Sequence, residues 1–292
     1  MGIKSIRRVL VPLDGSDISE QAVRLAAKVA RRTGASLRIV HVREPVDDRA
    51  TYPEELLAAP ELEGTDAHAA VLAGDVRQAL MQDALEWDAD LIVMTSRGRG
   101  GLKRAILGSV ADELVRQSRI PVLLVRPHET VEPTPGEFVR VLVPLSGRPG
   151  SEEIISHVLA LTGTEGAHLT LLRITPPPVE HDRPSSGRIL GGAVLPAEDP
   201  YLSTLAARLA ERGVLTSIHP PERGDSAEAV LRVASESDAD LIAMTTRGLG
   251  GLDRAIFGST SDEVLRKAPC AVLVVRGDVV DTASDQEGEA GG

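Results

Sequence analysis

A glycine-rich segment at residues 96–109 carries the clearest chemical signal in the sequence. It runs Ser-Arg-Gly-Arg-Gly-Gly-Leu-Lys-Arg-Ala-Ile-Leu-Gly-Ser, and a helical pattern begins at its end. Glycines such as Gly98 let a backbone approach a bound group with its N–H groups turned inward. Gly108 and Ser109 lie at the helix start, where unpaired amides and a dipole worth roughly +0.5 charge favour an anion. The segment therefore predicts a phosphate cradle.

Taken alone, this segment also has an ordinary interpretation, because glycines after a strand often form turns and Ser109 could be an N-cap. It matches neither the Walker nor the dinucleotide-binding fingerprint. The same positions recur, however, as Gly248, Gly258 and Ser259 in a second segment. The recurrence favours the phosphate cradle.

The sequence contains an internal repeat of one domain-sized unit. The sequence Arg-Val-Leu-Val-Pro-Leu occurs at residues 8–13 and again at 140–145. Residues 88–126 and 238–276 match at 24 of 39 positions without a gap. We expect domains at 1–126 and 139–276, called here the first and second copy. A Pro-rich linker at 127–138 joins them, and an acidic tail at 277–292 is expected to be disordered.

Each copy alternates short apolar strands with helices. In the first copy we expect strands at 9–12, 37–42, 69–72, 91–95 and 122–125, and helices at 18–32, 76–87 and 109–117. A full helix at 202–211 of the second copy replaces a short segment at 53–59. This pattern predicts an α/β fold of two tandem doubly wound domains, each with a five-stranded parallel sheet and helices on both faces. Ligands of such sheets bind beyond the carboxyl ends of the strands.

The composition excludes several function classes. With 43 acidic and 32 basic residues, the net charge of −11 opposes broad binding to nucleic acid or anionic membranes. Aromatic residues are 2 % of the chain, too few for base-stacking platforms. No apolar run approaches the roughly 18 residues of a membrane span. We therefore expect a soluble, cytoplasmic protein without nucleic-acid or membrane partners.

Several motifs together resemble those of the universal stress protein family. The first is Val-Leu-Val-Pro-Leu-Asp-Gly-Ser at 9–16, and the second is the spacing of Gly98, Gly108 and Ser109, followed by Val-Ala-Asp-Glu-Leu. Gly-Asp at 74–75 and Pro-Val-Leu-Leu-Val at 121–125 complete the pattern. The resemblance covers both copies and leaves out the linker and tail.

The resemblance implies an ATP site, with or without Mg²⁺. In ATP-binding members the Asp after the first strand engages the adenosine end, the end of the second strand lines the adenine pocket, and the glycine loop holds the phosphates. The matching residues here are Pro12, Leu13, Asp14, Val42, Gly98, Gly108, Ser109 and Val110. Where the ATP motif has a glycine, this chain has Thr95, and Thr245 in the second copy. A β-carbon there would either crowd the phosphates or alter the loop.

The two copies differ in charge at these positions. Between Ser96 and Ser109 the sequence has four basic residues (Arg97, Arg99, Lys103 and Arg104) and no acid. The matching segment of the second copy has two arginines opposed by Asp253, and Ser146 replaces Asp14. A polyphosphate suits the first copy better, so we rank it as the better site. The alternative is that its basic residues form a solvated face.

Other candidate groups give weaker signals. The seven histidines have no metal-ligand spacing, and no catalytic triad or metal site is predicted. Cys270 opens an apolar strand and is expected in the core. The pairs Asp88/Asp90 and Asp238/Asp240 precede the fourth strand of each copy. They lie at the edge opposite the ligand edge, where capping is expected rather than catalysis.

The sequence thus predicts a stress-response regulator that binds ATP with little or no catalysis, at most slow hydrolysis. The alternative is a protein-interaction or dimerisation module with degenerate nucleotide sites and an unidentified protein partner. Because the closing strands 122–125 and 272–275 are apolar edges, and family members commonly pair through this strand, we expect the two copies to pack together with pseudo-two-fold symmetry. Whether the chain also forms a homodimer stays open.

Overall fold

The computed structural model describes residues 3–43, 52–97, 107–126, 138–148, 150–175, 199–220, 222–223, 226–247 and 259–277. Three predicted site residues, Gly98, Gly248 and Gly258, lie outside these ranges. The same is true of the predicted linker apart from Phe138, and of the predicted tail after Gly277.

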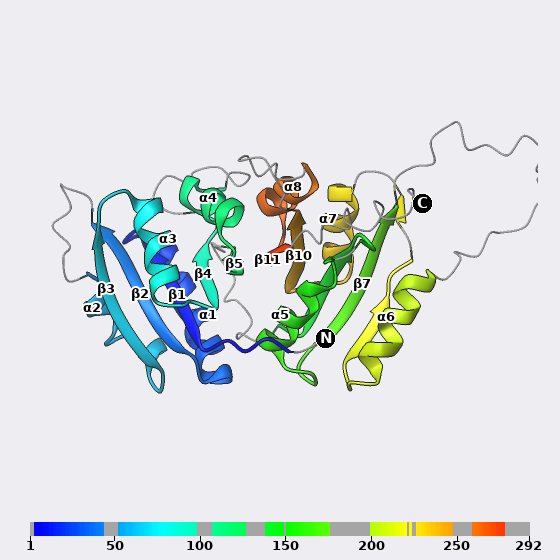
Figure 1. The fold of residues 1–292 in the computed structure, drawn as a ribbon, viewed down its shortest axis with the longest axis horizontal. Helices are drawn as coiled ribbons and strands as arrows, with labels where there is room; N and C mark the ends of the chain where they lie inside the picture. The colour runs from blue at the N-terminus through cyan, green and yellow to red at the C-terminus, as the bar shows by residue number, and fades with distance from the viewer. Residues whose placement is uncertain are drawn as a thin grey trace, which may run out of the picture.

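Both copies fold as strands alternating with helices, as predicted (Figure 1). The strands of the first copy are β1 (Arg8–Leu13), β2 (Ser36–Arg43), β3 (Asp66–Ala73), β4 (Leu91–Thr95) and β5 (Val122–Val125). Those of the second copy are β6 (Arg140–Leu145), β7 (His168–Thr175), β8 (Leu215–Ile218), β9 (Glu222–Arg223), β10 (Leu241–Arg247) and β11 (Ala271–Gly277). The strands predicted for the first copy lie at the right places and differ only at their ends, whereas the second copy has one strand beyond the predicted five, the two-residue β9 beside β7.

The helices follow the same order in both copies. In the first copy they are α1 (Asp17–Thr33), α2 (Tyr52–Leu56), the 3-10 helix η1 (Pro60–Leu62), α3 (Val76–Glu86) and α4 (Ser109–Gln117). In the second copy they are α5 (Glu153–Thr162), α6 (Pro200–Ala210), α7 (Ser226–Glu236) and α8 (Ser259–Lys267). The expected difference between α2 and α6 is present, because the single turn of α2 stands where α6 has eleven residues.

Local sequence explains the helix boundaries near the candidate site. The Ser16 hydroxyl caps α1 by accepting a hydrogen bond from the Ser19 amide. Gly34, at a φ of 72°, ends the helix in the left-handed conformation that glycine adopts without strain. In the second copy, Asp199 caps α6 through the amides of Tyr201 and Leu202. The Ser16 cap thus joins the turn after β1 to the start of α1, and the Asp199 cap determines where α6 begins.

The strands form one continuous sheet in the order β3-β2-β1-β4-β5-β11-β10-β6-β7-β8, with β9 beside β7. Pairing is parallel within each copy, and β5 and β11 pair antiparallel at the centre of the molecule (Figure 1). Leu123 lies opposite Leu273 at this junction. The expected pairing of the two copies through their closing strands is therefore confirmed.

The core has two layers, one on each face of the sheet. Apolar side chains of α1, α5 and α6 pack on one face, and those of α3, α4, α7 and α8 pack on the other. Cys270 is buried in the second layer, and burial raises the pKa of its thiol to about 12. It is a core residue, as predicted.

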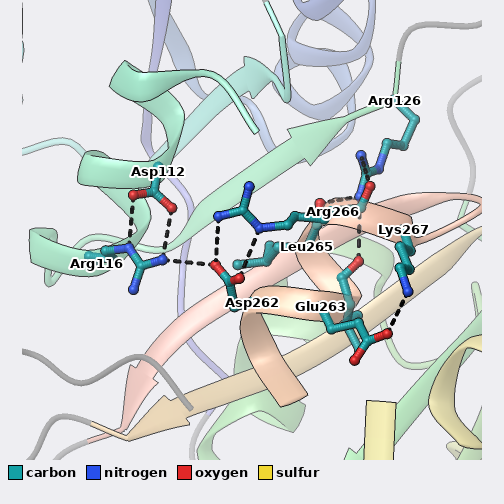
Figure 2. Close-up of polar contacts among 9 residues, drawn as sticks. Asp112, Arg116, Arg126, Asp262, Glu263, Leu265, Arg266 and Lys267 are labelled. Atoms are coloured by element: carbon teal, nitrogen blue, oxygen red, sulfur yellow. Dashed lines mark hydrogen bonds and ion pairs between the residues drawn. The ribbon is translucent and has the colours of Figure 1, made fainter. Parts of the chain in front are cut away.

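Charged residues of α4 and α8 join the two copies above the β5–β11 junction (Figure 2). Arg116 donates to Asp112 on its own helix through Nε and Nη2, at 2.9 Å in both cases. Its Nη2 also donates to Asp262 Oδ1 of α8 at 2.8 Å. Asp262 accepts two further hydrogen bonds from Arg266. One carboxylate of the second copy therefore serves arginines of both copies.

The aspartates before the fourth strand of each copy cap the opposite edge of the sheet. Asp90 Oδ2 accepts hydrogen bonds from the amides of Arg7 and Arg8, at 2.8 and 3.1 Å. Asp240 holds the amides of Val139 and Arg140 in the same way. The structural role expected of these pairs is confirmed for Asp90 and Asp240.

Candidate functional site

The strand order of the first copy reverses between β1 and β4, which is where ligands bind in open α/β sheets. Leu10 of β1 pairs with Ile92 of β4, so the register places Leu13 level with Thr95. Leu13 also pairs with His41 of β2, which puts Asp14 level with Val42. The topology therefore brings the predicted residues of three strand ends to one edge of the sheet.

Asp14 is held in a fixed orientation by the turn that follows β1. Its Oδ1 accepts hydrogen bonds from the Ser16 amide at 3.0 Å and from the Ser16 hydroxyl at 2.6 Å. Gly15, at a φ of 76°, provides the left-handed step of this turn. Because the carboxylate is half-buried and oriented, it is suited to accept hydrogen bonds from hydroxyl or amino groups of a ligand.

Thr95 acts on the backbone of the loop that follows β4. Its side chain is buried, and its hydroxyl donates a 2.6 Å hydrogen bond to the carbonyl oxygen of Arg97. Threonine therefore fixes the first turn of the loop through a bond that a glycine could not make. Of the two alternatives predicted for Thr95, this contact matches the altered loop, and the crowding of a phosphate stays a prediction.

The amino end of α4 lies beside the same edge, and its first backbone amides have no partner among the residues that the structure describes. Gly108 is the N-cap, with no side-chain cap, and its amide donates to the Ser96 carbonyl at 2.9 Å. The first intrahelical bond runs from Asp112 to Gly108, so the amides of Ser109, Val110 and Ala111 precede it. Ser109 is exposed, and its hydroxyl forms no hydrogen bond within the described part of the chain. These groups can bind an anion.

Packing does not explain why position 108 is glycine. Its φ of −63° is accessible to any residue. An added β-carbon would lie 3.6 Å from the Ser96 carbonyl oxygen and 3.8 Å from the Arg97 α-carbon, at ordinary contact distance among the described residues. Within the described residues, neither backbone conformation nor packing therefore requires a glycine at this position.

The remaining predicted residues frame this edge. Pro12, Leu13 and Val42 are buried at the ends of β1 and β2. Val110 is half-buried against the layer under α4. Ser259 begins α8 and is exposed at the matching place in the second copy. At the edge of the first copy, Pro12, Leu13, Val42 and Val110 are therefore the apolar residues, and the polar groups are those of Asp14, Ser109 and the first amides of α4.

Sequence reasoning missed a contact that occurs in each copy, between a side chain of the second strand and a nearby tyrosine ring. His41 is buried beside Leu13, with Nδ1 3.0 Å from the Leu13 carbonyl oxygen. Its ring meets Tyr52 edge-on at 5.4 Å, and the Tyr52 hydroxyl donates to Glu20 at 2.8 Å. Burial, followed by the hydrogen bond to Glu20, raises the pKa of Tyr52. The histidine therefore packs under the strand end instead of facing solvent.

In the second copy the position of His41 is taken by Arg173, which pairs with Leu145 at the end of β6. The Arg173 Nη1 lies 3.0 Å from both oxygens of Asp199, and the guanidinium lies 5.3 Å from the Tyr201 ring centroid. A β-carbon on Gly147 would approach this guanidinium to 3.2 Å. A cation thus lies directly against the loop that corresponds to Asp14 and Gly15. The repeat pattern could have revealed this exchange.

Comparison with known proteins identifies the family. Residues 5–126 and 137–276 both match the model of the universal stress protein family. A universal stress protein of Mycolicibacterium smegmatis is 27% identical over 92% of this chain and 96% of its own length. A shorter one of Thermus aquaticus is 36% identical over 41% of this chain and 98% of its own length. The chain therefore belongs to the universal stress protein family and contains two copies of its domain.

The solved structures support the same fold. A universal stress protein from Archaeoglobus fulgidus superposes with a TM-score of 0.69 at 22% identity, over 92% of this chain and 98% of that one. A Pseudomonas aeruginosa protein of unknown function gives a TM-score of 0.67 at 21% identity. These likenesses confirm the two-domain α/β fold. Among the helices described here, none combines the length and the apolar character that a membrane span requires.

Proposed function

We propose that this protein is a cytoplasmic stress-response regulator that binds ATP, with or without Mg²⁺, at the carboxyl edge of its first copy. The observation that carries the proposal is the amino end of α4. Its leading amides and the Ser109 hydroxyl have no hydrogen-bond partner among the described residues, and they lie beside the point where the strand order reverses. That combination of donors and helix dipole suits the phosphates of a nucleotide.

The residues at the carboxyl ends of β1 and β2 are suited to bind the nucleoside part of the ligand. Asp14, held by Ser16, offers a fixed carboxylate for ribose hydroxyls or an exocyclic amine. Val42 and Leu13 supply apolar surface at the same level. The predicted Gly98 would complete the phosphate contacts, and its place is not part of the described structure. The residues present therefore fit the group that the family resemblance implies.

We propose that the protein has little or no catalytic activity toward ATP. Hydrolysis of ATP needs a group that orients or deprotonates the attacking water. The Asp14 carboxylate is engaged with the Ser16 amide and hydroxyl, which fits an orienting role better than that of a general base. We expect at most slow turnover.

A second candidate function, a protein-interaction module, is favoured by the second copy. There Ser146 accepts a 3.3 Å hydrogen bond from the Arg148 amide, and no carboxylate occupies that position. Arg173 lies against the adjoining Gly147. If both edges were degenerate in this way, pairing through strands such as β5 and β11 would be the chain's principal biochemical property.

Titration calorimetry of the full chain with Mg-ATP separates the two functions. We expect binding with a dissociation constant tighter than about 1 mM, which corresponds to roughly −4 kcal/mol. Ser109→Ala removes a donor to a charged group, so its affinity should fall about tenfold. The matched variant Ser259→Ala should bind ATP like the unmodified chain. Absence of heat at millimolar ATP would leave the interaction module as the better account.

A further inference from the structure

The carbonyl oxygen of Leu13, directly before Asp14, is held by a buried side chain of the neighbouring strand. Leu13 of β1 pairs with His41 of β2, and His41 Nδ1 lies 3.0 Å from the Leu13 carbonyl oxygen. A carbonyl oxygen only accepts hydrogen bonds, so the proton of this bond must be on Nδ1. Because His41 is 2% exposed, little water competes for the bond. The imidazole therefore holds the chain at the last residue before Asp14.

A tyrosine of α2 contacts the same imidazole. The rings of His41 and Tyr52 meet edge-on, with their centroids 5.4 Å apart and their planes at 77°, which is a favourable arrangement for two aromatic rings. The Tyr52 hydroxyl donates to Glu20 Oε1 of α1 at 2.8 Å. Burial, the hydrogen bond with Glu20 and the negative charge of Asp14 all raise the pKa of Tyr52. Tyr52 therefore connects His41 to α1 and lies within electrostatic reach of Asp14.

The backbone of Glu20 leads back to the turn that carries Asp14. The Glu20 amide donates to the Ser16 carbonyl oxygen at 3.2 Å, and the Ser19 hydroxyl donates to the same oxygen at 2.8 Å. Ser16 in turn donates to Asp14 Oδ1 through its amide and its hydroxyl. The contacts therefore close a circuit, in the order Leu13, His41, Tyr52, Glu20, Ser16 and Asp14.

Among the described residues, the second copy does not close such a circuit. The side chains that correspond to Glu20, His41 and Tyr52 are Glu152, Arg173 and Tyr201. Glu152 accepts a hydrogen bond from Arg208 of α6, and Arg173 donates to Asp199. The buried Tyr201 hydroxyl forms no hydrogen bond of standard geometry within the described part of the chain. The circuit is therefore a property of the copy that carries Asp14.

We propose that His41, Tyr52 and Glu20 are positioning residues, which hold the turn after β1 so that the Asp14 carboxylate is oriented before a ligand binds. This inference rests on the proposed ATP function, in which Asp14 contacts the nucleoside. A group already held in its binding conformation loses less conformational entropy when the ligand binds, so the affinity is higher. The three side chains act through the backbone and need not touch the ligand.

Titration calorimetry of the full chain with Mg-ATP tests this role. His41→Leu removes the donor to the Leu13 carbonyl, so the affinity for ATP should fall about fivefold. His41→Asn should recover most of the affinity, because its side-chain amide can donate from nearly the position of Nδ1. Tyr52→Phe loses only the bond to Glu20, and its affinity should fall about twofold. The matched variant Tyr201→Phe in the second copy should bind ATP like the unmodified chain.

A double-mutant cycle separates positioning from a general structural role. NMR titration with ATP can follow the weaker binding expected of Asp14→Ser. Adding His41→Leu to this variant should cause little further loss, because the carboxylate that His41 orients is already gone. Equal fold losses in the unmodified and Asp14→Ser backgrounds would show that His41 does not act through Asp14, and would overturn the inference.

Nitrogen NMR of the ligand-free full chain tests the first contact without ATP. We expect a proton on Nδ1 of His41, because the Leu13 carbonyl oxygen needs a donor. A His41 ring without that proton, or His41→Leu binding ATP like the unmodified chain, would overturn the inference and leave the proposed function intact. If the unmodified chain itself binds no ATP, the proposed function fails and the positioning role fails with it. The unmodified chain therefore distinguishes the two failures.

Discussion

The two copies share a scaffold but differ at the loop that follows their first strand. In the first copy this loop carries Asp14, whose carboxylate accepts two hydrogen bonds from Ser16. In the second copy the same place has Ser146, and the guanidinium of Arg173 lies beneath the next residue, Gly147. The neighbouring strand position thus changed from the buried His41 to an arginine paired with Asp199.

This difference shows how a duplicated fold can retain its architecture while its site chemistry diverges. Both loops follow parallel strands with the same register, since Leu13 pairs with His41 and Leu145 pairs with Arg173. The sign of the nearest charged group is reversed between them. A ligand end that donates hydrogen bonds, as a nucleoside does, is favoured by the carboxylate and disfavoured by the guanidinium. We therefore propose that the first copy is the one that binds a nucleotide.

The largest expected effect comes from replacing Asp14 of the first copy by serine, the residue at the matching position of the second copy. Asp14→Ser removes a charge-assisted acceptor, so the affinity for ATP should fall about 10- to 100-fold. Calorimetry of the full chain measures the change. Ser146→Ala is the matched control and should leave the affinity unaltered. An Asp14→Ser protein that binds ATP normally would show that the carboxylate is not a ligand contact.

The reverse exchange sharpens the comparison. Ser146→Asp alone should add no second ATP, because the new carboxylate would lie close to the Arg173 guanidinium and pair with it. The double change Ser146→Asp with Arg173→His copies the first copy at both positions, and we expect weak additional binding that raises the stoichiometry above one. If the single change were already sufficient, Arg173 would not be the residue that separates the two copies.

A smaller effect is expected at the contact between α4 and α8. Asp262 accepts hydrogen bonds from Arg116 and Arg266, whereas Asp112 accepts hydrogen bonds only from Arg116 among the described contacts. Partly exposed ion pairs contribute little, so Asp262→Asn should lower the free energy of unfolding by about 1 kcal/mol. Asp112→Asn, which breaks a pair within one helix, should cost about 0.3–0.5 kcal/mol. Denaturant unfolding distinguishes the two variants.

The pH dependence provides a second test of the same contact. Hydrogen bonds from Arg266, aided by the charge of Arg116, lower the pKa of Asp262 in the folded chain. A carboxylate with a lowered folded pKa stabilises the protein fully above its unfolded pKa of about 3.9, and loses this effect as pH falls through the folded value. The difference between the unmodified protein and Asp262→Asn should thus be constant above about pH 5 and shrink below pH 4. A difference that grows on acidification would contradict the assignment.

The repeated strand and helix patterns predicted most of the fold. Apolar runs such as 91–95 and 122–125 are buried strands because both of their faces are covered by helices. The pairing of β5 with β11 could be anticipated because an apolar edge strand needs a partner. The division of residues 52–62 into the short α2 and η1 could not be anticipated, because Pro60 and the local turns determine where these helices begin and end.

The sequence pattern could not predict polar contacts between residues that are far apart in the chain. Arg97 was predicted either to help bind a polyphosphate or to lie on a solvated face, but its Nε is buried and has no hydrogen-bond partner among the described residues. Arg126 looked like the end of a strand, yet it reaches the carbonyl oxygens of α8 across the junction. Both contacts depend on how the two copies meet, which no local spacing encodes. His41 and Arg173 differ from these arginines because their exchange is visible once the copies are aligned.

The crystal structure of the full chain grown with ATP tests the central assignment most directly. The account predicts phosphate density at the amides of Ser109 and Val110, with the nucleoside beside Asp14, and no nucleotide at the loop that follows β6. ATP bound beside Ser146 and Ser259 while the edge of the first copy stays empty would contradict it.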